Sequence, residues 1–132
     1  MKKIIVLLLS LISFSTINKA QSLMEKWPEL KAFHSVMSQT FHPSEEGNLQ
    51  PIKERSAELL EKANALSKST IPADYKNEKI SNAVKRLAIG AEKLNTAIKD
   101  KKISDAEITQ ALTKLHDVFH EIIGLCKNEE KH

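Results

Sequence analysis

The stretch SDAEITQALTKLHDVFHEIIGLC, residues 104–126, decides the fold that the sequence predicts. Ser104, with Glu107 three residues later, has the spacing of a capping box and predicts the start of a helix. Apolar residues then recur every three or four positions, the period of a helix with one buried face. They are Ile108, Ala111, Leu112, Leu115, Val118, Phe119, Ile122, Ile123 and Cys126. We therefore expect an amphipathic helix whose apolar face is covered by other helices.

Three earlier segments show the same helical period and are separated by breaks rich in Pro, Gly and polar residues. They cover about residues 22–41, 51–69 and 75–99. Pro28 and Pro51 each fit the first turn of a helix, because that position needs no amide hydrogen. Four amphipathic helices of similar length with short connections predict an all-α fold, an up-down-up-down antiparallel four-helix bundle.

The N-terminus has the features of a secretory signal peptide. Two lysines precede a mostly apolar run over residues 4–17, and Ala20 offers a cleavage site. The alternative is an uncleaved membrane anchor, but this run of about fourteen residues is shorter than the ~20 that a membrane span needs. We therefore expect a cleaved signal peptide at 1–20 and one bundle domain at 21–132. The protein would then be periplasmic or secreted, without membrane contact after cleavage.

The charges and the single cysteine limit the partners. The chain carries 20 Lys and Arg against 17 Asp and Glu, but three of the lysines and none of the acids lie in residues 1–20. The remaining domain is formally neutral with interspersed signs, so it lacks the basic surface that nucleic acid requires. Cys126 is the only cysteine, so it is buried, pairs with a second chain in a homodimer, or binds a ligand.

Three histidines are predicted to converge between the first and last helices. His116 and His120 are four residues apart, so both imidazoles share one helix face, at the edge of the apolar stripe. The first and last helices of the predicted bundle are neighbours, and His34 lies at the level of this pair. His34 is also about 40° from Leu30, inside the apolar stripe, so we expect it to point inward. Three imidazoles suit Zn²⁺ or a copper ion, with a fourth position for water, a carboxylate or a thioether.

Further candidate metal ligands lie near these histidines in the predicted bundle; they are Met37, His42 and Glu46. Met37 is one turn from His34 and would favour Cu(I). His42 forms a looser second site with the glutamates that follow it, or folds back toward the first site. Glu58 or Glu61 of the second helix would supply a carboxylate as ligand or as partner of a histidine. The alternative for the histidine pair is a solvated helix edge, and for Met37 a place in the core.

Two other classes of function are weighed against metal binding. A helical binding module, with incidental histidines, predicts an exposed apolar patch and no effect of metal on melting. An enzyme is not expected, because the sequence lacks a nucleophile elbow, a Gly-rich phosphate loop and a His-Glu-x-x-His zinc motif. The histidine pair of the last helix shares only its spacing with that zinc motif.

An exported helical bundle with histidines in its last helix resembles the cytochrome b562 and cytochrome c′ families in architecture and length, without a shared specific motif. The resemblance implies a haem protein that transfers electrons. Cytochrome c′ proteins attach haem through Cys-x-x-Cys-His near the C-terminus, whereas this chain has Leu-Cys-Lys-Asn-Glu at 125–129, which excludes covalent haem. For haem held as in cytochrome b562, Met24 and His120 would be the ligands. Cys126 is expected opposite Met24 and His120 lies well inside its helix, so the sequence favours a metal ion over haem.

Overall fold

The structure is a computed structural model that describes residues 19–131. The regular elements of this range are all helical: α1 (Lys19–Lys26), α2 (Pro28–Glu45), α3 (Gln50–Lys68), the short 3-10 helix η1 (Ala73–Tyr75), α4 (Glu78–Lys99) and α5 (Asp105–Glu129). The predicted signal peptide falls almost entirely outside the described residues. None of the helices within 19–131 combines the length and the apolar character needed to cross a membrane.

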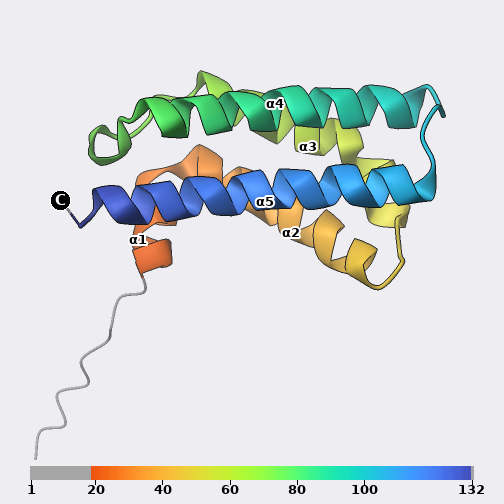
Figure 1. Cartoon of the computed structure of the whole chain (residues 1–132), viewed down its shortest axis with the longest axis horizontal. Helices are drawn as coiled ribbons and strands as arrows, with labels where there is room; N and C mark the ends of the chain where they lie inside the picture. Colours follow the sequence, from red (N-terminus) through yellow and green to blue (C-terminus); the bar gives the residue numbers. More distant parts are fainter. Residues whose placement is uncertain (1–18, 132) are drawn as a thin grey trace, which may run out of the picture.

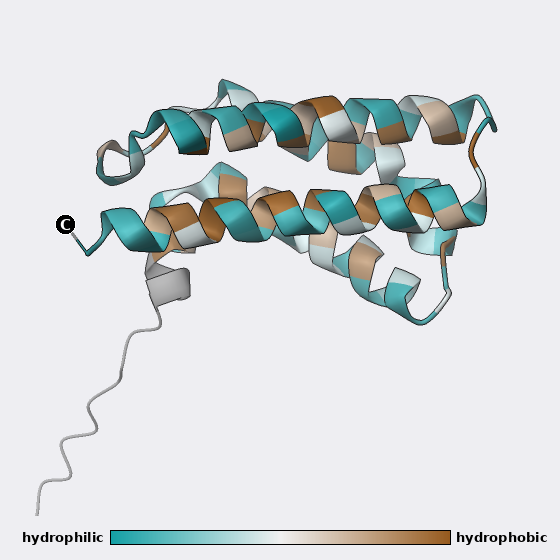
Figure 2. Cartoon of the chain, in the orientation of Figure 1, coloured by the Kyte–Doolittle hydropathy of each residue, from teal (hydrophilic) through white to brown (hydrophobic). Residues whose placement is uncertain are grey.

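Four long helices, α2 to α5, pack around one apolar core (Figure 1). α3 packs against α2 and α4, and α5 packs against α4 and, less extensively, against α2. Apolar and hydrophilic residues alternate along α4 and α5, as the colours of Figure 2 show. Core side chains with no exposed surface include Leu30, Phe33, Ile52, Leu87, Leu112 and Ile122. The prediction of an all-helical fold with four packed helices is confirmed.

The first predicted helix is divided at Trp27. This residue has φ −131° and ψ 80°, outside the helical region, because the ring of Pro28 disfavours helical geometry in the residue before it. α1 therefore ends at Lys26, and Pro28 occupies the first turn of α2. The Trp27 indole is fully buried and donates a hydrogen bond from Nε1 to Ser69 Oγ over 2.9 Å. The break thus ties the start of α2 to the end of α3.

The prediction that the first helical segment ends near residue 41 is wrong, because α2 continues through His42 and Pro43 to Glu45. A proline in the last turn removes only its own amide donor, and the helix continues past it. Gly47, with φ +82°, then closes α2: its amide and that of Asn48 each donate to a carbonyl of the last turn over 3.0 Å, a Schellman motif. α4 ends in the same motif, with Lys101 at φ +52° in the position that glycine usually holds.

One buried hydrogen bond links α3 to α4. Ser56 and Asn95 are each only 5% exposed, and Ser56 Oγ donates to Asn95 Oδ1 over 2.9 Å. Buried polar groups need such partners, because leaving one unpaired away from water is costly. This pair therefore fixes how the two helices face each other.

The two ends of α5 are both fastened. At its start the predicted capping box is confirmed: Glu107 N donates to Ser104 Oγ over 3.2 Å, and Ser104 N donates to Glu107 Oε2 over 2.8 Å. At its end, Tyr75 OH donates to Glu130 Oε1 over 2.5 Å. Cys126 is buried, and burial together with nearby glutamates raises the pKa of its thiol to about 12. Of the three alternatives for Cys126, the structure supports a buried, protonated thiol.

Candidate metal site

The histidine pair of α5 is the centre of the candidate site. Nε2 of His116 and Nε2 of His120 lie 3.2 Å apart, and the two rings are 4.4 Å apart between centroids with planes at 78°. His116 is half-buried and His120 is exposed, as expected at the edge of the apolar face. The four-residue spacing thus brings the two imidazoles into contact on one side of the helix.

His34 lies on the facing helix, but it does not point into the core as predicted. Its side chain is exposed, and its ring stacks on Phe119 of α5 with centroids 4.9 Å apart and planes 14° apart. The prediction is wrong because it treated residues 22–41 as one continuous helix and so counted Leu23 and Trp27, which precede α2, in the apolar stripe. At about 100° of rotation per residue, the middle of the buried face of α2 lies about 80° around the helix axis from His34. His34 therefore occupies the edge of the buried face.

Two reciprocal ring stacks join α2 to α5. His34 of α2 lies on Phe119 of α5, while Phe41 of α2 lies on His116 of α5 with centroids 3.8 Å apart and planes 13° apart. Both phenylalanines are buried, so each offers a fixed surface that orients one imidazole.

α2 diverges from α5 toward its C-terminal end (Figure 1). We call the surface where the two helices meet the histidine seam; its members are His34, His42, His116 and His120.

His42 belongs to the histidine seam through the last turn of α2. Its ring centroid lies 6.4 Å from that of His116, with the planes at 72°. Its Nδ1 lies 3.1 Å from Glu45 Oε2, a contact that holds one ring nitrogen and leaves Nε2 available as a ligand. The sequence left open whether His42 groups with the glutamates or approaches the first site. In the structure it does both.

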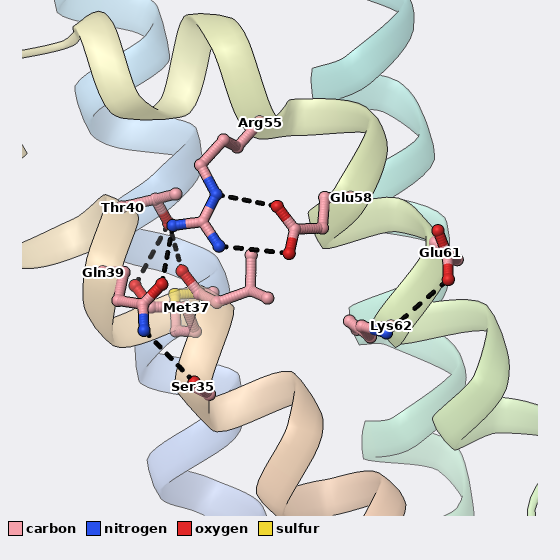
Figure 3. A network of polar contacts seen from close by, with 9 residues as sticks. Ser35, Met37, Gln39, Thr40, Arg55, Glu58, Glu61 and Lys62 are labelled. Atoms are coloured by element: carbon pink, nitrogen blue, oxygen red, sulfur yellow. Dashed lines mark hydrogen bonds and ion pairs between the residues drawn. The ribbon is translucent and has the colours of Figure 1, made fainter.

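The remaining candidates lie apart from the histidine seam. Met37 is fully buried in the core, and Glu46 is exposed at the C-terminal cap of α2. Glu58 accepts two hydrogen bonds from Arg55, from Nε over 2.7 Å and from Nη2 over 3.1 Å, and Glu61 pairs with the neighbouring lysine at 3.6 Å (Figure 3). The bond from Arg55 lowers the pKa of Glu58. Glu58 is therefore engaged within α3 by Arg55, which also donates to Gln39 Oε1 of α2 over 2.7 Å, and is not directed to the histidines.

The electrostatic setting favours neutral imidazoles. Partial desolvation of the His34 ring, which is covered on one face by Phe119, lowers its pKa, and the nearby charges of His120 and His42 lower it further. Burial likewise lowers the pKa of His116, with His120 acting in the same direction and Asp117 opposing it. A metal binds the neutral form of imidazole through a free ring nitrogen. Lowered pKa values therefore keep the ligand form populated at neutral pH.

The side chains form one contacting pair with two flanking imidazoles, and not a closed centre. Across residues 19–131, no three His, Cys, Asp or Glu side chains are arranged to hold one metal ion. The three-imidazole centre predicted from the sequence thus needs a rotation of the His34 or His42 ring toward the α5 pair. Both rings are exposed, so a rotation would displace little of the core.

Similarity to other proteins does not guide the assignment. The chain was compared with protein-family models, with curated proteins and with solved structures, and none of the three comparisons gave a match. Function is therefore inferred from the geometry of the site.

Sequence reasoning missed the two phenylalanines as parts of the site, because it treated them only as core. A signal was present in their spacing. Phe41 lies seven residues after His34, two turns along α2, and Phe119 lies three residues after His116 on α5. Each helix thus presents one histidine and one phenylalanine on the same edge.

Proposed function

We propose that the protein is an exported, transition-metal-binding helical bundle that sequesters, buffers or senses Zn²⁺ or a copper ion through the histidine seam. The observation that carries the proposal is the 3.2 Å separation between the Nε2 atoms of His116 and His120. A metal ion bonded to both atoms at about 2.0–2.1 Å would make an N–metal–N angle of roughly 100–105°, near the tetrahedral value. The pair therefore suits two neighbouring positions of a four-coordinate zinc ion.

Two candidates for the third ligand lie on the same surface. His42 is held at Nδ1 by Glu45, which leaves its Nε2 free, and His34 approaches from the other end of the seam. A carboxylate that fixes one nitrogen of a ligand histidine is a common partner in metal sites. One of these two imidazoles, with water in the last position, would complete the coordination. The proposal is of a binding protein, and it assigns no catalytic residue.

The proposal includes the up-down-up-down order of the helices and the cleaved signal peptide at 1–20. The contacts along the histidine seam support opposite directions for α2 and α5, because His34 meets Phe119 whereas Phe41, later in α2, meets His116, earlier in α5. The two lysines before the apolar run support export to the periplasm or out of the cell.

Isothermal titration of the metal-free protein with Zn²⁺ and with Cu²⁺ tests the proposal. We expect saturable binding that the double substitution His116→Gln, His120→Gln weakens at least about tenfold, since two of the ligands are lost. The matched control is Thr109→Ala with Thr113→Ala, which changes two residues of α5 at the same spacing and keeps every imidazole. Metal affinity that survives the loss of both histidines would refute the proposal.

A hydrogen bond between the two rings produces the same Nε2 separation, and the titration distinguishes the two interpretations. If the pair is only hydrogen-bonded, the protein will bind neither ion and its melting temperature will not respond to metal. If a metal is bound, its preference for the folded state raises the melting temperature with metal concentration. Titration with haem tests the haem alternative in parallel, and we expect no Soret band, because the histidines lie at the surface.

A further inference from the structure

A groove between α4 and α5 combines an apolar floor with a basic rim. It encloses about 440 Å³, a volume within the ~300–1,000 Å³ of small-molecule sites. The floor is apolar and comes from both helices and the turn between them; it includes Leu94, Ala97, Ile103, Ala111, Leu115 and Val118. The rim carries Arg86, Lys93 and Lys114, and none of the residues lining the groove is acidic. The groove therefore suits a ligand that is apolar along its length and negative at one point.

The groove lies next to a position where α4 and α5 pack closely together. A Cβ atom added at Gly90 would lie 2.6 Å from Leu115 Cδ2, so α4 and α5 touch at this level. Between this contact and the α4–α5 turn, Ala97 and Ala111 line the groove with short side chains. A second cavity of about 360 Å³ has Ile103 in common with the groove, and its lining includes the ion-paired Lys53 and Asp105. The apolar space is thus elongated and runs from the Gly90 contact toward Ile103.

Two lysines at the groove are available to pair with a ligand. Arg86 donates from Nη2 to Glu121 Oε1 over 2.6 Å, so its charge is already paired. Lys93 and Lys114 are both exposed, and within residues 19–131 neither forms an ion pair. Lys93 lies three residues from Gly90, and Lys114 adjoins its contact partner in α5. Two unpaired cations therefore flank one end of the apolar space.

We infer that this groove binds a medium-chain fatty acid, with the carboxylate between Lys93 and Lys114 and the alkyl chain directed toward Ile103. A carboxylate matches the charge of the rim, and a charge-assisted bond to lysine is stronger than a neutral one. Lys114 lies nine residues after the start of α5 at Asp105, beside Ile103, which is about 14 Å along the helix and suits a chain of medium length.

The surrounding surface argues for a small ligand over a protein partner. In the part of the chain that the structure describes, Ile89 is the only exposed large apolar side chain, at 53%. A stable protein interface buries about 800 Å² on each partner, with an apolar centre. With one exposed large apolar side chain, the described surface offers no apolar centre of that kind, whereas the groove has an apolar floor that an alkyl chain can contact.

Titration of the full-length protein with dodecanoate, below its micelle concentration, tests the inference. We expect saturable binding, and the double substitution Lys93→Gln, Lys114→Gln should weaken it about tenfold or more. The matched control, Lys79→Gln with Lys85→Gln, removes two exposed lysines of α4 that do not line the groove and should bind as the unmodified protein does. Dodecyltrimethylammonium has the same tail with the opposite charge and is expected to bind far more weakly.

A second variant tests the apolar part of the groove. Ala111→Leu fills the space and should abolish dodecanoate binding, while Ala106→Leu, an exposed position of the same helix, should not. Circular dichroism establishes that both variants remain folded. The inference is overturned if dodecanoate does not saturate, if both head groups bind equally, or if the groove variants bind as their controls do. It is also overturned if phosphatidylglycerol vesicles bind through the same lysines and dodecanoate does not, since the site would then recognise a membrane surface.

Discussion

Replacing Gly124 by alanine should stabilise the protein. Gly124 lies inside α5, is exposed, and has no atom within 4 Å of the position that a Cβ would take. Glycine in a helix interior costs ~0.8–1.0 kcal/mol relative to alanine, because more backbone freedom is lost on folding. With no clash to oppose this gain, Gly124→Ala should raise the free energy of unfolding by about 1 kcal/mol. For a domain of this size, that corresponds to roughly 4–6 °C in melting temperature.

Gly90 provides the matched comparison in α4. The propensity gain is the same, but the new Cβ would lie 2.6 Å from Leu115 Cδ2, and Leu115 is only 4% exposed. Overpacking a core usually costs ~1–3 kcal/mol, so Gly90→Ala should be neutral or destabilising by up to about 2 kcal/mol. Urea unfolding followed by circular dichroism measures both variants. Equal stabilisation at the two positions would refute the close contact of α4 and α5 on which the depth of the groove depends.

Three further predictions concern stability. The free energy of unfolding should fall as the pH drops below about 6.5, because the lowered pKa values of His34 and His116 mean that the unfolded chain binds more protons. Urea unfolding midpoints at about pH 8 and about pH 5.5 measure this change. The double substitution His34→Gln, His116→Gln should reduce the dependence of the midpoint on pH. Lys101→Gly should raise the free energy of unfolding by about 1 kcal/mol in the same assay, because glycine adopts the left-handed conformation at the end of α4 without the strain that lysine has there. An unchanged free energy of unfolding would contradict that geometry. Ser56→Ala should lower the free energy of unfolding by ~1–3 kcal/mol, because Asn95 Oδ1 loses its hydrogen-bond donor. Adding Asn95→Leu should restore part of that stability. A loss that the second substitution leaves unchanged would contradict a direct bond between the two side chains.

Much of the fold follows from local chemistry that the sequence shows directly. The capping box at Ser104, the prolines at helix starts and the helical period each act within a few residues, so they can be read without tertiary information. The end of α2 could not be read in this way. Pro43 predicts a break, yet the helix continues through it and closes four residues later at Gly47. The position of a helix end depends on which nearby residue can adopt the left-handed conformation.

In the candidate site, contacts between side chains of the same helix were predictable from the sequence, whereas contacts between side chains of different helices were not. The contact of His116 with His120 depends only on helical spacing, whereas the orientation of His34 depends on where α2 begins. Including Trp27 in the stripe rotates the expected buried face toward His34 and makes it appear inward. The stacking of His34 on Phe119 depends on the rotation of both helices, which no single segment specifies.

The limited packing between α2 and α5 has a consequence for local unfolding. Protein segments open independently with free energies that depend on how much structure each opening disrupts. α2 meets α5 less extensively than it meets α3, and two histidine–phenylalanine stacks lie along the edge of the meeting surface. Amide hydrogens along this edge should therefore exchange with solvent before those of α4. A metal ion bound across the histidine seam would raise the free energy of that opening. The metal-bound protein would therefore be more rigid along this edge, a difference that a protease or a partner protein could sense.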